Sequence, residues 1–255
     1  MKILQYNLLD GCKTLDRYEP FLKWLSVQDY DVVGFNELND WTEVEFQREM
    51  DNCGYPFTCL FQMDSSPYFI GVAAKSPITL INKLEDSPFY HGMLHVKVHH
   101  INFLVTHLCP FESVKREKEA EAIVKYIHPF QEPVIVMGDF NTFSPLDQDF
   151  YELDKILARE RKVMQHIQNG KINYRPMEIL LEAGLHDIND EEKLDFSMPT
   201  EISNSKDPFY SRLDYVLVND YLLKKNPTAK VLRNTEVAKL SDHYPIECEL
   251  DDYLY

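Results

Sequence analysis

Short apolar runs, each closed by a polar residue or a turn former, recur from one end of this chain to the other. The first three segments alternate in type, with a strand-like run over 2–9, an amphipathic helix over 18–27 and another apolar run over 31–35. Runs this short are typical of strands, and the order strand, helix, strand is how α/β folds begin. The pattern therefore predicts an α/β fold.

The middle of the chain predicts a meander of antiparallel strands, half-buried where apolar and polar residues alternate, as in 92–98. The strands expected in this part are 57–61, 68–74, 78–84, 92–98 and 101–106. Helices are expected at 44–52, 112–126, 147–168 and 176–183, and further strands at 133–137, 210–218, 229–232 and 246–250. No internal repeat or linker interrupts the pattern, so residues 1–255 are predicted to form a single domain.

The acidic balance of the chain limits which partners it can have. It carries 26 Lys and Arg against 42 Asp and Glu, a formal net charge of −16. This charge argues against a protein that holds nucleic acid mainly through a basic surface, so a nucleic-acid partner is not favoured. An enzyme that meets phosphate through a bound cation remains compatible with it, because the metal supplies positive charge locally.

Cysteine use and the first residues indicate where the protein works. The five cysteines are odd in number and form no Cys-x-x-Cys pair, so neither a disulfide framework nor a zinc ribbon is indicated. The N-terminus reaches polar residues too soon for a secretory signal, and no apolar stretch approaches the ~20 residues of a transmembrane segment. A cytoplasmic protein, expected to be monomeric, is the interpretation.

Polar residues that can perform chemistry stand at the ends of several apolar runs. They are Asn7, Glu37, His107, Asp139, Asn141, Asp214, Asp242 and His243. Taken singly, a polar residue after a strand is usually a turn former or a helix cap, and a lone His is usually structural. Asp214 is different, because it stands within the expected strand 210–218, and an ionised carboxylate there needs a partner.

As a set, these residues predict a metal-assisted active site. Carboxylates that converge on one rim repel one another and raise each other's pKa. A hard divalent cation removes that penalty, and carboxylate and amide oxygens are ligands that Mg²⁺ and Mn²⁺ prefer. Two histidines nearby can stabilise a charged, phosphate-like transition state. No P-loop, dinucleotide fingerprint or nucleophilic Ser or Cys motif competes, so the residues indicate a metal-dependent phosphoester hydrolase.

Six blocks of the chain resemble the endonuclease/exonuclease/phosphatase superfamily, which includes deoxyribonuclease I, exonuclease III-type repair enzymes, neutral sphingomyelinases and inositol polyphosphate 5-phosphatases. The blocks occur in the family's order over residues 5–245. They are Gln5-Tyr6-Asn7, Asn36-Glu37-Leu38, Thr106-His107-Leu108, Gly138-Asp139-Phe140-Asn141-Thr142, Arg212-Leu213-Asp214-Tyr215-Val216 and Ser241-Asp242-His243-Tyr244-Pro245.

The resemblance implies a deoxyribonuclease I-like, four-layer α/β/β/α sandwich, with the site where the strand ends of two facing sheets meet. It implies Glu37 as the principal Mg²⁺ ligand, helped by Asn7 and Asp242, with Mn²⁺ as a substitute. Asp139 would position and deprotonate the attacking water, and Asn141 would hold the phosphate and the water in line. Asp214 would orient His243, which with His107 would donate to the non-bridging oxygens.

The substrate is less constrained than the reaction. Repair enzymes of the exonuclease III type tend to carry Tyr where His107 stands, which favours the other branches and a small phosphorylated or lipid-headgroup substrate. Segments 143–173 and 196–211 are expected either to wall the substrate pocket or to be a surface helix and an ordinary connection. Residues 115–119 are expected to form a solvated helix face with i, i+4 charge pairs.

Two other functions remain as alternatives. A non-specific nuclease would share the reaction, although the chain lacks a Lys/Arg stripe of the kind that tracks a nucleic-acid backbone. A catalytically silent binding protein would share the fold, although it would need neither a metal ligand nor a water-positioning Asp.

Overall fold

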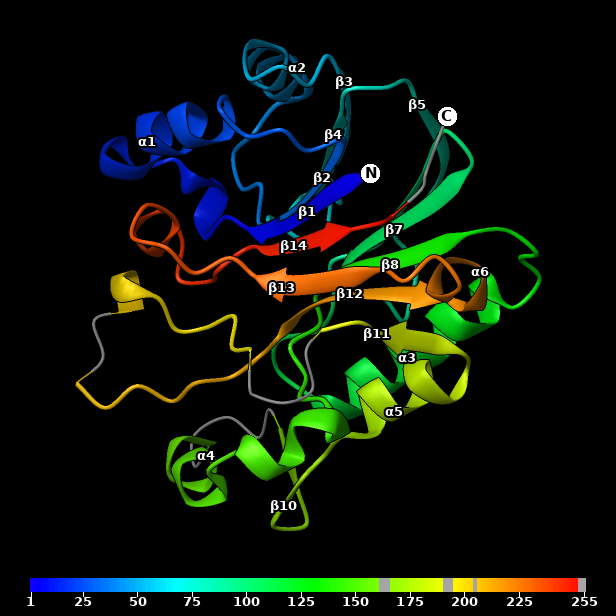
Figure 1. Cartoon of the computed structure of the whole chain (residues 1–255). Helices are drawn as coiled ribbons and strands as arrows, with labels where there is room; N and C mark the ends of the chain where they lie inside the picture. The colour runs from blue at the N-terminus through cyan, green and yellow to red at the C-terminus, as the bar shows by residue number, and fades with distance from the viewer. Residues whose placement is uncertain (161–165, 190–194, 204–205, 252–255) are drawn as a thin grey trace.

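Two six-stranded β-sheets, stacked face to face, form the centre of the protein (Figure 1). The computed structural model describes residues 1–160, 166–189, 195–203 and 206–251. The first sheet has the order β13 (Thr228–Val231), β14 (Ile246–Glu249), β1 (Lys2–Asn7), β2 (Val32–Asn36), β4 (Ile70–Ala74) and β3 (Phe57–Phe61). Strands β1 and β2 are parallel, and the other pairs in this sheet are antiparallel.

The second sheet repeats this plan with a parallel pair at its centre. Its order is β11 (Leu185–Asp187), β12 (Asp214–Asn219), β8 (Val134–Asp139), β7 (Ile101–His107), β6 (Met93–Val98) and β5 (Ile78–Leu84). Strands β7 and β8 are parallel, and their neighbours are antiparallel. Parallel strands bring their carboxyl ends to one edge of a sheet, so each sheet presents two such ends to a common site.

Helices cover the outer face of each sheet. The first sheet is covered by α1 (Leu15–Leu25) and α2 (Glu43–Asn52), and the second by α3 (Ser113–Ile127) and α5 (Arg175–Glu182) (Figure 1). The remaining elements are shorter: α4 (Leu153–Glu160), α6 (Asp220–Leu223), the hairpin of β9 (Ile167–Gln168) and β10 (Lys171–Ile172), and the 3₁₀ turns η1 (Asp10–Cys12), η2 (Pro145–Phe150), η3 (Glu201–Ser203) and η4 (Val237–Lys239). Within the described ranges, no helix is both long and apolar enough to cross a bilayer.

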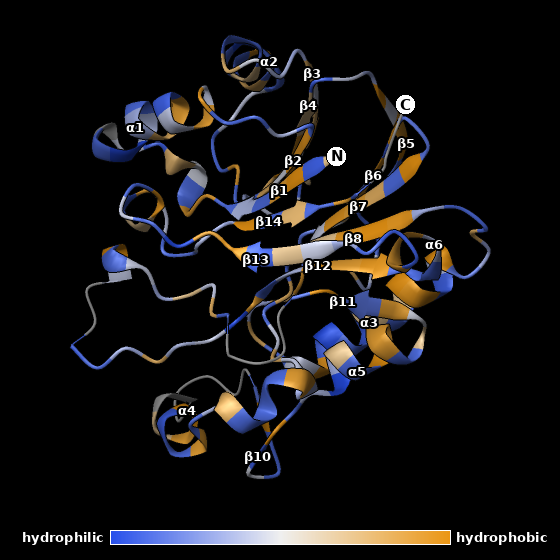
Figure 2. Cartoon of the chain, in the orientation of Figure 1, coloured by the Kyte–Doolittle hydropathy of each residue, from blue (hydrophilic) through white to orange (hydrophobic). Residues whose placement is uncertain are grey.

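Each sheet is covered by the other sheet on one face and by helices on the other, so the central strands are apolar on both faces. In β1, Ile3 faces the layer between the two sheets, whereas Leu4 and Tyr6 face α1. Figure 2 shows long hydrophobic stretches along β7, β8 and β12, whereas α1, α2 and α3 mix hydrophobic and hydrophilic residues. The four-layer sandwich implied by the family resemblance is confirmed.

Three expectations about the elements are wrong. The strands from 57 to 107 pair antiparallel, but β3 and β4 belong to the first sheet and β5, β6 and β7 to the second. Strand β6 is not half-buried, because His95 lies under Tyr126 of α3. Residues 147–168 are not one helix: η2 and α4 occupy the first part, and 161–165 lie outside the described residues.

Candidate metal centre and active site

The ends of β1 and β2 bring the first two site residues together. Asn7 is the last residue of β1 and pairs in register with Asn36, the last residue of β2. Glu37 follows directly and has a φ of 57°, in the left-handed region that a residue with a side chain rarely adopts. Backbone strain of this kind tends to persist at functional sites, where the surrounding structure imposes it.

The second sheet delivers three more residues to the same edge. His107 and Asp139 end the parallel strands β7 and β8 and lie in register with each other. Asp214 is the first residue of β12, which runs antiparallel to β8, and it pairs with Asp139. The predicted mid-strand position of Asp214 is therefore wrong: its strand begins at 214, which places its carboxylate at the strand end beside that of Asp139.

A glycine allows β7 and β8 to approach closely at this edge. Gly138 has a φ of 149°, and a Cβ built on it would lie 1.8 Å from the carbonyl oxygen of Thr106. Only a residue without a side chain fits there. Gly138 therefore permits the register that sets Asp139 beside His107.

Asn36 ties the two sheets together beneath the site. Its Oδ1 accepts the backbone N–H of Asp139 at 2.8 Å and the amide of Gln5 at 2.7 Å. Its Nδ2 donates to the carbonyl of Thr106 at 3.0 Å. The sequence predicts no role for Asn36. The available signal is its amide side chain, which directly precedes Glu37 at the end of an apolar run and needs a hydrogen-bond partner if it is buried.

The carboxylates of Glu37 and Asp139 share one amide. Nδ2 of Asn7 donates to Glu37 Oε1 at 3.2 Å and to Asp139 Oδ2 at 3.0 Å. The backbone N–H of Asp10 donates to the other oxygen of Glu37 at 3.1 Å. One ligand atom from each of Glu37, His107 and Asp139 lies within 4.8 Å of the other two. The convergence of distant segments that the sequence predicts is thus present.

Burial makes the ionised form of these carboxylates unfavourable. It raises the pKa of Glu37 above its usual range, against the opposing effect of the Asp10 hydrogen bond. Burial also raises the pKa of Asp139 to about 7, and the adjacent charge of Asp214 adds to the effect. A positive charge between the two groups would remove this cost.

The two histidines beside Asp139 have opposite electrostatic environments. His243 Nδ1 lies 2.7 Å from Asp214 Oδ2, and its Nε2 lies 3.9 Å from Asp139 Oδ2. Burial alone would lower the pKa of His243, but the charges of Asp214 and Asp139 hold it well above its usual range. His107 Nε2 lies 3.5 Å from Asp139, and burial, with His91 and His243 nearby, holds its pKa well below its usual range. These shifts favour the protonated form of His243 and the neutral form of His107.

Asn141 and Asp242 complete the predicted set. The backbone N–H of Asn141 donates to Asp139 Oδ1 at 2.9 Å, and its side-chain amide donates to the carbonyl of Leu108 at 3.0 Å. Asp242 belongs to neither of the two compact groups, Glu37 with His107 and Asp139, or Asp139 with Asp214 and His243. Its charge nevertheless raises the pKa of Glu37. Of the six acidic and histidine residues in the predicted set, Asp242 is thus the one that joins neither group.

The residues present fit a hard divalent cation. The carboxylates of Glu37 and Asp139, both with raised pKa values, face a common point, and an amide lies between them. The amide of Asn7 presents its NH₂ group to both carboxylates, while its Oδ1 accepts the N–H of Leu9 at 3.0 Å. Turning this amide would present its oxygen instead, giving the all-oxygen donor set that Mg²⁺ and Mn²⁺ favour.

A pocket of about 380 Å³ opens onto these groups. It is lined by Glu37, His107, Asp139, Asn141 and His243, and by the loops that carry Leu9–Asp10, Ser65–Tyr68, Tyr90–His91 and Pro110–Phe111. None of the described residues of 143–173 or 196–211 lines it, so the expectation that those segments wall the pocket is wrong for the part of them that the structure describes. Segment 196–211 instead supports the backbone at Asp214, because Ser197 Oγ accepts the N–H groups of Leu213 and Asp214.

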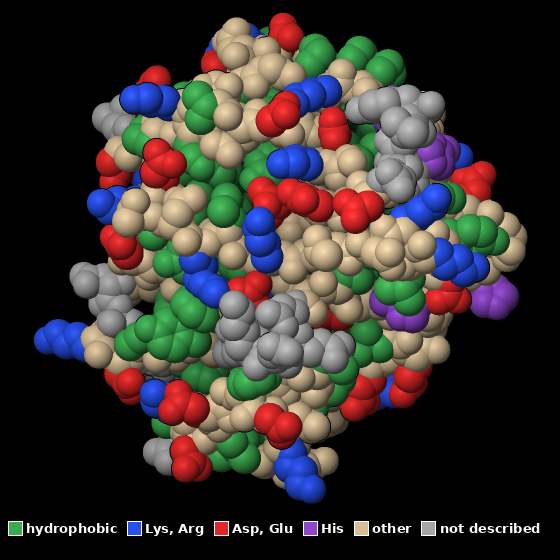
Figure 3. Space-filling view, viewed as in Figure 1, with side chains coloured by type: hydrophobic (Ala, Val, Ile, Leu, Met, Phe, Trp, Pro, Cys, Tyr) green, Lys and Arg blue, Asp and Glu red, His purple; other side chains and the backbone are tan. Residues whose placement is uncertain are grey.

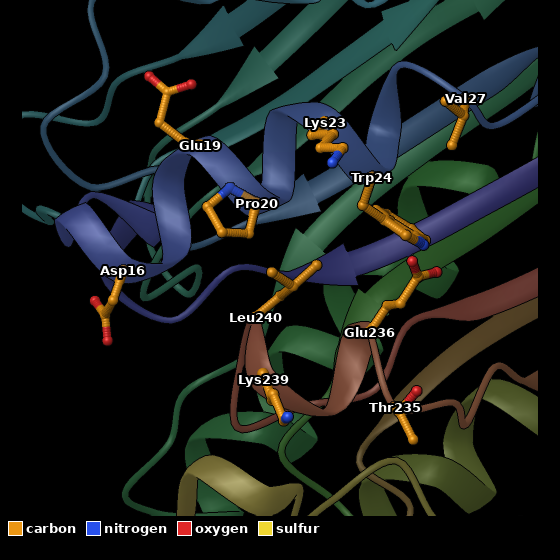
Figure 4. A pocket seen from close by; sticks show the side chains of 10 residues that line it. All are labelled: Asp16, Glu19, Pro20, Lys23, Trp24, Val27, Thr235, Glu236, Lys239 and Leu240. Atoms are coloured by element: carbon orange, nitrogen blue, oxygen red, sulfur yellow. The ribbon is translucent and has the colours of Figure 1, made fainter.

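A larger hollow, about 740 Å³, lies between α1 and η4 (Figure 4). Its lining mixes Trp24 and Leu240 with charged side chains, among them Glu19, Lys23 and Lys239. None of the eight predicted site residues lines it. The convergent carboxylates and histidines therefore single out the smaller pocket as the reactive one.

The helix that follows His107 differs from its predicted solvated face. Arg116 and Glu119 are both fully buried, because α3 packs its charged side under the site loops. Glu119 accepts the backbone N–H groups of Tyr90 and Cys109, each at 2.8 Å, and Arg116 donates to the carbonyl of Cys109 at 2.8 Å. These two residues hold in place the loops at Tyr90 and Cys109 that lead into the pocket lining. The sequence did not indicate this role, because most of the residues next to them in the helix are charged and typical of an exposed face.

His91 is a second residue that sequence analysis missed. It is 2 % exposed, lines the pocket and stacks on His107, with ring centroids 4.4 Å apart and an interplanar angle of 26°. Burial lowers its pKa to about 4, so it is neutral at physiological pH. Its position between turn residues gave no periodic signal in the sequence.

Comparison with known proteins agrees with this architecture. Three solved structures of low sequence identity share the fold: an AP endonuclease from Archaeoglobus fulgidus (16% identity, TM-score 0.73, 98% of this chain and 99% of that chain covered), a 3′-5′ exonuclease, NExo, from Neisseria meningitidis (17%, 0.72, 98% and 100%), and an endonuclease/exonuclease/phosphatase family protein from Leptotrichia buccalis C-1013-b (17%, 0.66, 98% and 99%). No curated protein sequence matches the chain.

The model of the Endonuclease/Exonuclease/phosphatase family matches residues 4–243, a range that includes all eight predicted site residues. The match covers nearly the whole chain and confirms the resemblance seen in the six sequence blocks. Members of this family hydrolyse phosphoesters with the help of a divalent metal. This chain belongs to the Endonuclease/Exonuclease/phosphatase family and is a metal-dependent phosphoester hydrolase.

Proposed function

We propose that the protein is a Mg²⁺-dependent hydrolase of a small phosphorylated molecule or a lipid headgroup, with Mn²⁺ able to replace Mg²⁺. The observation that carries this proposal is the convergence of Glu37, His107 and Asp139 within 4.8 Å, beside the 2.7 Å contact between Asp214 and His243. Glu37 holds the cation, helped by Asn7 and Asp242. When bound, the cation polarises a phosphoryl oxygen and offsets the negative charge that develops on it.

Asp139 is the group that removes a proton from the attacking water. A pKa of about 7 suits a base that works near neutral pH, and the backbone N–H of Asn141 holds one oxygen of the carboxylate in place. The hydrogen bond from the amide of Asn7 holds the second carboxylate oxygen, Oδ2 of Asp139, in place. The carboxylate is thus oriented before substrate binds, which reduces the reorganisation needed during the reaction.

His243 and His107 stabilise the phosphoryl oxygens from the other side. The cationic His243 is oriented by Asp214, which fixes the proton on Nδ1 and leaves Nε2–H to donate to substrate. His107 is neutral and donates through one nitrogen only. Groups whose environments push their pKa values apart are a common way for one site to hold both a base and a cationic donor.

The substrate is expected to be small and to carry few phosphates. Among the described residues that line the pocket, none is Lys or Arg, so extra phosphates would lack compensating charge. The chain's net charge of −16 works against long polyanions. On the face in Figure 3, Lys and Arg side chains lie scattered among Asp and Glu side chains.

A substrate panel with Mg²⁺ or Mn²⁺ tests the proposal: sugar and inositol phosphates, sphingomyelin, bis(p-nitrophenyl) phosphate, plasmid DNA and RNA. We expect release of product from a small phosphoester or the lipid, abolished by EDTA and restored by Mg²⁺. Asp139→Asn is the matched control, because it keeps the size of the side chain. Absence of hydrolysis across the panel with either metal would refute the proposal.

A nuclease is the second candidate, and the solved structures support it. Two of them are described as an AP endonuclease and a 3′-5′ exonuclease. A further solved structure with this fold, of a NExo variant from Neisseria, is described as a 3′ phosphatase bound to a product DNA hairpin. Cleavage of plasmid DNA or RNA at a rate above that of every small substrate in the panel would favour this candidate over the first.

A further inference from the structure

His91 and His107 form a stacked pair of buried imidazole rings in the pocket wall. His91 is further enclosed by Tyr68 and Tyr90, whose ring centroids lie 5.1 Å and 4.7 Å from its own, both edge-to-face. With 2 % of its surface exposed, the ring has one well-defined position. None of the roles proposed above uses it.

Ser66 contacts the ring of His91 at Nδ1. Its Oγ accepts the backbone N–H of Tyr68 at 3.2 Å and lies 2.5 Å from His91 Nδ1. A serine hydroxyl has one proton to donate and two lone pairs to accept with, so Ser66 can donate to Nδ1 while it accepts from Tyr68. A neutral imidazole that accepts at Nδ1 carries its proton at Nε2.

Nε2 of His91 is buried and has no hydrogen-bond partner among the described residues. A buried N–H without an acceptor is unfavourable, and such a group in a native structure calls for an explanation. The ring lines the pocket that holds Glu37, Asp139 and His243, so a bound phosphoester would bring oxygen acceptors to it. The same pocket offers no Lys or Arg within the described part of the chain, so a neutral donor would be valuable there.

We propose that His91 contacts the substrate directly, its Nε2–H donating a hydrogen bond to an oxygen of the phosphoryl group beside His107. Ser66 is the positioning residue that holds the ring in the required tautomer. This inference rests on the proposed function, because it assigns a further substrate contact to the same site.

Two substitutions at His91 test which nitrogen matters. Steady-state kinetics with bis(p-nitrophenyl) phosphate and Mn²⁺ should show His91→Asn, whose amide reaches only the Nδ1 position, lowering kcat/KM on the order of 100-fold. His91→Gln, whose amide reaches the Nε2 position, should retain most of the activity. Equal losses in both variants, or wild-type activity in both, would overturn the assignment.

A double-mutant cycle separates direct contact from an effect on His107. If His91 binds substrate itself, His91→Asn still lowers kcat/KM in a His107→Gln background by a comparable factor. If it only holds the ring of His107, the second substitution has no further effect, and the proposal is refuted. Ser66→Ala should give a smaller loss than His91→Asn, on the order of 10-fold, that is absent in the His91→Gln background.

Loss of folding is controlled with a histidine elsewhere in the second sheet. His95 is also buried, but its ring contacts Tyr126 and Asn102. His95→Asn should lower Tm and leave kcat/KM of the folded protein unchanged, whereas His91→Asn should lower kcat/KM at temperatures well below its Tm. Failure of this inference is distinguishable from failure of the proposed function, because the proposed function is judged on the wild-type enzyme alone: it fails if that enzyme hydrolyses nothing in the panel or cleaves DNA or RNA faster than every small substrate.

Discussion

Asp139 receives contacts from both sheets, and its environment is the most informative at the residue scale. Asn36 and Asn7 from the first sheet bond to its backbone and side chain, and Asp214 and His107 from the second lie beside it. Four segments far apart in the sequence thus determine the position and the pKa of one carboxyl group. Substitutions at this residue and at Glu37 should have different kinetic effects.

Asp139→Asn is expected to lower kcat about 10³-fold, because the amide cannot accept the proton from water. The fold should persist and Tm should fall only modestly: the amide removes the cost of burying charge beside Asp214, but its NH₂ group faces one of the two donors, the N–H of Asn141 or the amide of Asn7. Stopped assays with Mg²⁺ and thermal melts measure the two effects. Activity close to that of the wild type would remove Asp139 from the role of base.

Glu37→Gln is expected to weaken the binding of the divalent cation first. One charged oxygen ligand becomes a neutral amide, so Mg²⁺ or Mn²⁺ should bind on the order of tenfold or more weakly. Calorimetric titration of Mn²⁺ into the EDTA-treated protein measures the affinity, and activity should partly return at high metal concentration. Unchanged affinity for the cation would contradict the assignment of Glu37 as the principal ligand.

At the scale of elements, the register of β7, β8 and β12 determines which residues meet. His107, Asp139 and Asp214 lie directly across from one another on these three strands. A shift of one residue would turn each side chain to the opposite face of the sheet. Gly138 and the loops held by α3 are therefore as important to the site as the residues that perform the chemistry.

Gly138→Ala is expected to destabilise the protein by about 3 kcal/mol or more, since the new Cβ would overlap the carbonyl of Thr106. Gly170 is the matched control: its φ is 75°, but nothing lies within 4 Å of a Cβ built there. Gly170→Ala should therefore show only the backbone penalty of about 1 kcal/mol. Urea unfolding measures both, and equal losses would show that the contact with Thr106 is unimportant.

Glu119 predicts a pH dependence of stability. Burial raises the pKa of its carboxyl from 4.5 to about 7 in the folded protein. Between these values the folded state holds a proton that the unfolded chain has released, so the free energy of unfolding falls as pH rises, by up to about 1.4 kcal/mol per pH unit. Glu119→Gln should remove this part of the slope between pH 5 and about pH 7.

The measurement is urea unfolding of the metal-free protein at several pH values. Glu121→Gln, on the exposed side of the same helix, is the matched control and should keep the slope of the wild type. A slope that Glu119→Gln leaves unchanged would show that another group titrates in this range.

At the scale of the whole molecule, charge separates the two enzymatic candidates. The chain has 16 more acidic than basic residues, and its pocket lining contributes no Lys or Arg from the described residues. Non-specific DNA binding depends on Lys and Arg that displace counterions from phosphates. A small phosphoester makes no such demand, because the cation and the histidines contact a single phosphoryl group.

We therefore expect Asp139→Asn protein with Mg²⁺ to bind a duplex of about 20 base pairs more weakly than about 10⁻⁵ M at about 50 mM salt. Fluorescence anisotropy of a labelled duplex measures this affinity, with deoxyribonuclease I under non-cleaving conditions as the positive control. Sub-micromolar binding that falls steeply as salt is raised would favour the nuclease.

The predicted secondary structure was most accurate where an apolar run was short and clearly bounded. The strand 57–61 and the strand 78–84 agree with β3 and β5 as they stand, because turn residues mark both of their ends. The prediction of one helix over 147–168 is wrong, because the charged composition of this stretch is typical of a helix and gives no signal for the turns within it. The eight predicted site residues could be singled out because each one stands at the end of an apolar run or beside one.

The amino-acid sequence by itself determined the α/β class, the family and the polar residues at the strand ends, because these depend on local periodicity and on motifs within a few residues. Only the tertiary structure decided that Asn36 bridges the sheets, that Arg116 and Glu119 are buried, and that His91 stacks on His107. These contacts join residues that are far apart in the sequence. They depend on sheet register and on how the layers pack, and no local pattern encodes either one.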